Sequence, residues 1–249
     1  MKTVYGVTIG SSSELAALPE MKAIQLLEIP GEMCTDDGGR QLRSRKHKKL
    51  MVNNSSDIRF FRSLFDAGSG VRQDFYRLFF NKCQAAAELG AAAVSLAPDL
   101  EGVAGDQAKF QRLQRTLGMC FGAAEKYRLP LNLELRIPGA VSAAPAEFVR
   151  LKHRLLYPLR TMCVLHPHEP GALEAMENFS GKCKFDCDMF RIVFDAAFGN
   201  YISGHLFRKL LSFVRPSGAA APVVIFDPGR GADSHAFAEL DRLVEEVAE

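Results

Sequence analysis

The chain contains a series of short apolar runs rich in Val, Ile, Leu or Phe, and longer segments of helical character separate them. Such runs are typical of strands buried on both faces of a parallel sheet, and their alternation with helices indicates βα units. Eight runs are present, at 4–9, 23–29, 50–53, 92–97, 131–135, 162–166, 191–195 and 223–227. Eight successive βα units predict a closed barrel.

The helical segments between the runs end at ordinary helix stop signals. The segments 74–89 and 108–127 end shortly before Gly90 and Pro130, and a last helix is expected over 234–249. A chain of 249 residues with 47% hydrophobic content has the usual size of one such barrel. The sequence therefore predicts an α/β protein, a (β/α)8 TIM barrel that forms a single domain over residues 1–249.

The charge and the cysteines of the chain indicate which partners and which cellular compartment to expect. The 31 basic and 29 acidic side chains leave a net charge of +2, so neither nucleic acid nor an anionic membrane is expected as a partner. No secretory signal and no membrane-spanning apolar stretch is visible, and we expect a cytoplasmic protein. The cysteines lie within expected helices and strands, which favours reduced, buried thiols over disulfides; they are Cys34, Cys83, Cys120, Cys163, Cys183 and Cys187.

Four successive strands end in one side chain that can bind a metal. These are Glu134, His166, Asp195 and Asp227, and the intervals of 32, 29 and 32 residues between them each match about one βα unit. In a closed barrel we expect the four side chains at one level of the mouth. Three carboxylates and an imidazole would repel one another or stay protonated unless a cation bridges them. A divalent metal is therefore expected, with Mn²⁺ or Mg²⁺ favoured and Zn²⁺, Co²⁺ or Fe²⁺ also compatible.

Two segments carry a resemblance to a known family. Residues 85–91 (AAAELGA) lead into the fourth strand, and residues 123–134 (AAEKYRLPLNLE) form a helix followed by a strand that ends in Glu134. The chain resembles, over nearly its whole length, the xylose isomerase-like TIM-barrel superfamily of sugar isomerases, sugar-phosphate epimerases and endonuclease IV-type enzymes. In that family Glu, Asp, His and Glu from strands five to eight hold the metal. Glu134 matches the first ligand, whereas His166, Asp195 and Asp227 stand where Asp, His and Glu are usual.

The resemblance implies a sugar or sugar-phosphate isomerase or epimerase. In such an enzyme the metal holds vicinal oxygens of the substrate and a carboxylate moves a proton beside the carbonyl. Glu134 and Asp227 are then the acid and base candidates, and Glu28, Arg136 and His168 are candidate substrate contacts. The loop 229–231 after the eighth strand is a candidate phosphate site. A small sugar is the expected partner, and a homo-oligomer is compatible with the sequence.

Each candidate residue also has a structural interpretation. Asp227 opens an Asp-Pro-Gly turn sequence, and Asp195 is a suitable cap for the next helix. His166 and His168 flank a proline in an expected loop, and Glu28 precedes a Pro-Gly pair and could face a loop.

Two other functions remain open. One is a non-catalytic or carbohydrate-binding barrel that has lost the metal cluster, since fold alone does not establish function. The other is an endonuclease IV-like phosphodiesterase, which is disfavoured because the basic run at 40–49 precedes the third strand and so lies away from the mouth. The six histidines of the whole chain would also have to supply a three-metal cluster.

Overall fold

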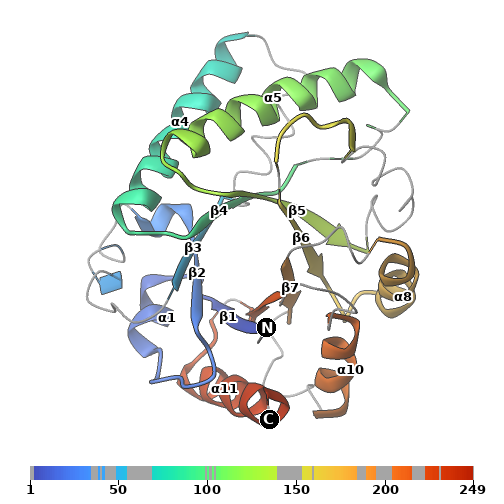
Figure 1. The fold of residues 1–249 in the computed structure, drawn as a ribbon. Helices are drawn as coiled ribbons and strands as arrows, with labels where there is room; N and C mark the ends of the chain where they lie inside the picture. Colours follow the sequence, from blue (N-terminus) through green and yellow to red (C-terminus); the bar gives the residue numbers. More distant parts are fainter. Residues whose placement is uncertain are drawn as a thin grey trace.

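In the computed structural model the strands form a closed parallel barrel in chain order, with β1 paired to β8 (Figure 1). The strands are β1 (Val4–Thr8), β2 (Leu26–Pro30), β3 (Lys49–Asn53), β4 (Ala93–Leu96), β5 (Leu131–Ile137), β6 (Arg160–Leu165), β7 (Met189–Val193) and β8 (Val223–Asp227). The predicted (β/α)8 TIM barrel is confirmed. The structure describes residues 3–34, 39, 41–42, 49–54, 69–98, 100, 103, 105–138, 153–158, 160–183, 189–194, 204–214, 222–229 and 231–248.

Helices surround the ring of strands (Figure 1). They are α1 (Ser12–Ala17), the short 3-10 helix η1 (Gly31–Cys34), α4 (Ser69–Glu88), α5 (Gln107–Lys126), α8 (Ala172–Cys183), α10 (Gly204–Val214) and α11 (Ser234–Ala248). The three helices predicted with explicit bounds are confirmed, although α4 begins five residues before the expected residue 74. Gly90 follows α4 with φ of 74°, a conformation that favours glycine.

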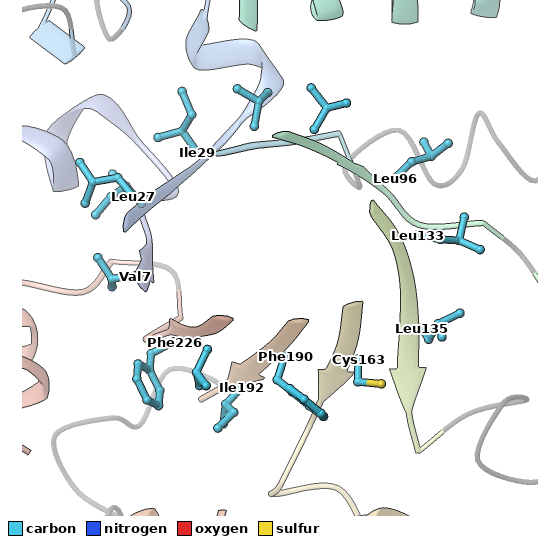
Figure 2. Packing of buried hydrophobic residues seen from close by; sticks show 14 of the residues in the cluster. Val7, Leu27, Ile29, Leu96, Leu133, Leu135, Cys163, Phe190, Ile192 and Phe226 are labelled. Atoms are coloured by element: carbon cyan, nitrogen blue, oxygen red, sulfur yellow. The ribbon is translucent and has the colours of Figure 1, made fainter. Parts of the chain in front are cut away.

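The apolar core lies between the strands and the surrounding helices. Figure 2 shows its labelled side chains pointing away from the inside of the ring; among them are Val7, Leu27, Ile29, Leu133, Leu135, Phe190, Ile192 and Phe226. Because successive strand residues face opposite sides, the residues between these positions must face the barrel interior. The alternation therefore turns Glu28, Glu134 and Arg191 inward.

A second, smaller apolar cluster also comes from the strands. It contains Leu26, Met51, Ala93, Met162, Met189 and Ile225. Several of these residues precede an inward-facing charged residue by two positions, as Leu26 precedes Glu28 and Met189 precedes Arg191, so they share its face of the sheet. The charged residues of the interior therefore have an apolar floor on the side of the strand N-termini.

The described cysteines are buried and unlinked. Cys34, Cys83, Cys120 and Cys163 are free thiols, and burial raises the pKa of Cys34 and of Cys83 to about 12. The expectation of reduced, buried thiols is confirmed for these four, while the side chains of Cys183 and Cys187 lie outside the described part of the chain. Among the helices that the structure describes, none has the length and apolar character needed to cross a bilayer.

Candidate functional site

A buried ion cluster occupies the middle of the barrel interior. Arg191 on β7 lies between two carboxylates, Glu28 on β2 and Glu134 on β5, and forms an ion pair with each. The side chains of Arg191, Glu28 and Glu134 are 5%, 0% and 4% exposed. Charges removed from water to this extent must be paired and hydrogen-bonded to be tolerated.

Each carboxylate of the cluster is held by several donors. Arg191 donates from Nε to Glu28 Oε2 at 2.8 Å, and its Nη2 also donates to Glu28 Oε1. Towards Glu134 it donates from Nη1 to Oε2 at 2.9 Å and from Nη2 to Oε1 at 3.0 Å. Thr8 adds a hydroxyl donor to Glu28 Oε2 at 2.8 Å, and Ser95 adds one to Glu134 Oε1 at 2.6 Å. All four carboxylate oxygens therefore accept a hydrogen bond from Arg191.

The electrostatics of the cluster keep the guanidinium charged. Burial disfavours the cation, but Glu134 and Glu28 outweigh burial and raise the pKa of Arg191 above its ordinary value. Burial raises the pKa of Glu28, and the neighbouring Glu134 adds to this, while Arg191 and Thr8 oppose it. One positive charge thus faces two carboxylates in a medium of low polarity.

Asp227 lies at the C-terminal end of β8, half-buried, in the region where barrel enzymes place their active sites. Its Oδ1 accepts a hydrogen bond from the backbone N–H of Gly229 at 3.0 Å, as expected of an Asp-Pro-Gly turn. Burial raises the pKa of Asp227, Glu14 adds to this, and the Gly229 bond and the positive fields of Arg191 and His166 oppose it. Asp227 is therefore both a turn residue and a carboxyl group with an altered proton affinity.

A third group lies at the ends of β5 and β6. Arg136, a predicted substrate contact, is 58% exposed and forms an ion pair with Glu169. His166 follows β6 and its Nδ1 lies 3.9 Å from Glu169 Oε1. His168, also a predicted substrate contact, is exposed, with its ring 6.5 Å from that of Phe194.

The strand register separates the predicted ligands. Glu134 is paired with Met162, four residues before His166, which follows the end of β6, while Asp227 is paired with Val193. Asp195 lies outside the described residues. The structure thus brings Glu134 together with Glu28 and Arg191, and it places Asp227 and His166 nearer the carboxyl ends of their strands.

Sequence reasoning missed Arg191, Ser95 and Thr8. A signal for Arg191 was present, because it is a charged residue inside the apolar run Met189–Val193, the same anomaly that identified Glu134. The small hydroxyl residues gave no comparable signal. The sequence predicts Glu28 as a substrate contact or a loop-facing group from its place near the end of the second strand, but the structure places it within β2 and fully buried, so it does not face a loop.

Comparison with solved structures identifies the fold. A D-tagatose 3-epimerase-like protein aligns with a TM-score of 0.64 and 15% identity, over 99% of this chain and 98% of its own. The 3-keto-D-glucoside 4-epimerase of E. coli aligns with a TM-score of 0.61 and 10% identity, over 98% of this chain and 100% of its own. The chain therefore shares the (β/α)8 barrel fold of these two epimerase structures. No protein-family model and no curated protein matches the chain.

A further solved structure has the same fold. A Thermus thermophilus protein studied after soaking with zinc chloride aligns with a TM-score of 0.62 and 16% identity, over 97% of this chain and 98% of its own. These identities show a shared fold and leave the chemistry to be argued from the residues.

The sequence resemblance to the xylose isomerase-like superfamily implies a divalent ion, and the contacts of the residues present can be compared with that expectation. Both oxygens of Glu134, which matches the family ligand, accept hydrogen bonds from Arg191, and Oε1 also accepts one from Ser95. A cation on Glu134 would sit beside the guanidinium and be repelled by it. Within the ranges that the structure describes, no three His, Cys, Asp or Glu side chains gather closely enough to hold a metal. The described residues do not fit a divalent ion at Glu134, and the four-ligand site stays a prediction because Asp195 is outside them.

Proposed function

We propose that this protein binds a sugar at the carboxyl end of the barrel and catalyses isomerisation or epimerisation by moving a proton next to the sugar carbonyl. The observation that carries the proposal is the half-buried Asp227 at the end of β8, whose carboxyl group lies in the positive field of Arg191. A fold shared with sugar epimerases supports the substrate class. We take the setting to be cytoplasmic and the partner to be a small sugar.

In this proposal Asp227 is the base. Burial and Glu14 raise the pKa of Asp227, which makes its carboxylate a better proton acceptor while Gly229 fixes its orientation. Removal of a proton beside a carbonyl places negative charge on oxygen, which the donors that bind the sugar must stabilise. Glu134, the other predicted acid or base, acts by holding Arg191, since both of its oxygens accept from that side chain. His166 and the exposed His168 are the candidate donors to sugar hydroxyls.

A free sugar fits the loop after β8 better than a sugar phosphate. The described backbone N–H groups of this loop, those of Gly229 and Gly231, already have acceptors: Gly229 donates to Asp227, and Gly231 donates to Glu14 Oε1 at 2.9 Å. A phosphate bound by the same N–H groups would displace one or both carboxylates and be repelled by them. Arg136 is also engaged, by Glu169. We therefore assign unphosphorylated ketoses and aldoses as the first substrates to test.

The test is solvent hydrogen exchange, which detects proton removal whatever the product. The protein is incubated in deuterium oxide with ketopentoses, ketohexoses and the corresponding aldoses, with and without added Mn²⁺, and deuterium beside the carbonyl is measured by NMR and mass spectrometry. Asp227→Asn should lower the exchange rate by about 100-fold or more, a usual effect of losing a general base. Asp74→Asn, at an exposed position on α4, is the matched control and should exchange like the wild type. Equal exchange in Asp227→Asn and wild type would exclude Asp227 as the base.

The second candidate is a carbohydrate-binding barrel without catalysis. It is favoured by the ion pairs of Glu134 with Arg191, because a carboxylate held in this way is not free to move a proton. The same sugars, titrated against the protein by calorimetry, separate the two functions. Binding without deuterium exchange for any sugar supports the binding protein, and binding with exchange supports the enzyme.

A further inference from the structure

The buried ion cluster holds two negative charges and one positive charge, whatever the catalytic role of the barrel. The barrel fold turns Glu28 and Glu134 into one interior, where their side chains are 0% and 4% exposed. Two carboxylates in such a place must be neutralised by a cation or by protons. Arg191 reaches both of them from β7.

We infer that Arg191 takes the place of a divalent cation between Glu28 and Glu134, so that the barrel keeps these carboxylates without a metal and a metal site arises there only when the guanidinium is removed. This inference does not rest on the proposed function. It concerns which cation occupies the interior, and its readouts are metal binding and thermal stability.

The geometry of the guanidinium supports the substitution. Its planar fork presents several N–H donors at once, and Nε, Nη1 and Nη2 together reach all four carboxylate oxygens. A metal ion bridging two carboxylates would bind the same oxygen atoms. The guanidinium is also permanently charged in proteins, so its neutralising effect needs no dissociable ion.

The surroundings are those of an oxygen-rich cation site once the guanidinium is taken away. Replacing Arg191 with alanine would leave two carboxylates from β2 and β5 facing each other. The hydroxyls of Thr8 and Ser95 already touch these carboxylates, at 2.8 and 2.6 Å. Hard divalent ions such as Mn²⁺ and Mg²⁺ favour carboxylate and hydroxyl or water oxygens. We therefore expect Arg191→Ala to gain affinity for Mn²⁺.

The experiment compares three forms of the full chain: the wild type, Arg191→Ala, and the triple variant Glu28→Gln/Glu134→Gln/Arg191→Met, in which the cluster is uncharged. Each is purified, freed of metal with a chelator and melted with chelator, with Mn²⁺ and with Mg²⁺, while bound Mn²⁺ is measured by plasma mass spectrometry. If Arg191→Ala does not fold in chelator, the variant is refolded with and without Mn²⁺ and the two refolding yields are compared. The triple variant shows whether the fold tolerates loss of the arginine once the carboxylates are neutral.

We expect the Tm of the wild type to be the same in chelator and in Mn²⁺. Arg191→Ala should melt roughly 10 °C lower in chelator, because it leaves two buried carboxylates uncompensated. Mn²⁺ should raise its Tm by about 5 °C or more and bind near-stoichiometrically, whereas the triple variant should gain neither.

Two results would overturn the inference. One is a wild type that holds a near-stoichiometric ion and melts lower when a chelator removes it, with the ion lost in Glu134→Ala. The other is an Arg191→Ala variant that gains no bound Mn²⁺ or Mg²⁺ and no stability or refolding yield from either ion. Deuterium exchange on sugars can be present or absent in all of these cases, so failure of this inference and failure of the proposed function are distinguishable.

Discussion

Arg191 and Glu134 lie 57 residues apart in the chain and are joined by two hydrogen bonds inside the barrel, Nη1 to Oε2 at 2.9 Å and Nη2 to Oε1 at 3.0 Å. One strand, β6, lies between their strands β5 and β7. The pair therefore links β5 to β7 across β6 through the interior, in addition to the backbone ladder.

Loss of Glu134 should be strongly destabilising. Glu134→Ala leaves Arg191 with Glu28 as its remaining partner in the cluster and removes the acceptor of the Ser95 hydroxyl. Breaking a buried ion pair by removing one partner typically costs about 3–5 kcal/mol, and we expect a loss of that order in the free energy of unfolding. Urea denaturation followed by far-UV circular dichroism measures it.

The control for this prediction is Glu125→Ala. Glu125 is exposed on α5, and substitutions of this kind usually change stability by no more than about 0.5 kcal/mol. A cost for Glu134→Ala as small as that of Glu125→Ala would mean that the ion pair does not form in solution.

The fold could be predicted from the sequence because strand burial leaves a direct mark. Each run that forms a strand alternates with a helical segment, and no other common architecture buries eight parallel strands in chain order. Boundaries were less predictable: β2 begins at Leu26, three residues after the expected residue 23. The polar Gln25 belongs to the connection, where its carbonyl accepts from Lys49 N at 3.0 Å.

The partners inside the barrel could not be predicted in the same way. Glu134 was found because a carboxylate in an apolar strand requires a partner, but the sequence does not say which residue supplies it. The stagger of the strands decides this, and it brings Arg191 rather than His166 to Glu134. A search for every charged residue within an apolar run would have found Glu28, Glu134 and Arg191 together, with charges that call for pairing.

Asp227 should make the stability of the protein depend on pH. Its pKa in the folded state is raised above the ordinary value of 3.8, chiefly by burial, so the folded protein binds this proton more tightly than the unfolded chain. The stabilising contribution of the protonated carboxyl is full when the pH is below the ordinary pKa of 3.8, and it is lost as the pH rises through the raised pKa of the folded state. Asp227→Asn keeps an uncharged acceptor for Gly229 at every pH. The stability of this variant relative to wild type should therefore increase as the pH is raised from about 4 to about 7.

The measurement is urea unfolding of both proteins across this pH range, with Asp74→Asn as the control. Asp74 is 70% exposed, so its substitution should give a difference from wild type that changes little over the same range. If the stability of Asp227→Asn relative to wild type fell as the pH rises, the pKa of Asp227 in the folded state would be lowered instead.

Asn132 should be a position where an apolar residue increases stability. It is fully buried on β5, its Nδ2 contacts Met51 Sδ at 3.5 Å, and its Oδ1 has no hydrogen-bond partner within the part of the chain that the structure describes. A buried amide in this state is unfavourable because folding removes its hydrogen bonds to water and does not replace all of them. Asn132→Leu should raise the free energy of unfolding by about 1 kcal/mol, measured by urea denaturation. A loss of stability of similar size would instead indicate an internal water bound to the amide.

Asp241 on α11 should be a strong anchor of the N-terminal part of the barrel. Its carboxylate accepts hydrogen bonds from the backbone N–H groups of Lys22 at 2.8 Å, Ala23 at 3.0 Å and Ile24 at 3.1 Å, just before β2. Asp241 is 9% exposed, so these donors would lack a full replacement for the carboxylate if it were removed. Because unsatisfied buried donors cost about 1–3 kcal/mol each, partly offset by water near the surface, Asp241→Ala should lower the free energy of unfolding by about 3 kcal/mol.

Two further variants serve as controls for the Asp241 prediction. Asp241→Asn, which keeps one acceptor oxygen, should lose less stability than the alanine variant, and both should be measured beside Asp74→Ala. Hydrogen exchange completes the test: the amides of Lys22, Ala23 and Ile24 should exchange faster in Asp241→Ala, and unchanged protection there would mean that another acceptor holds this segment.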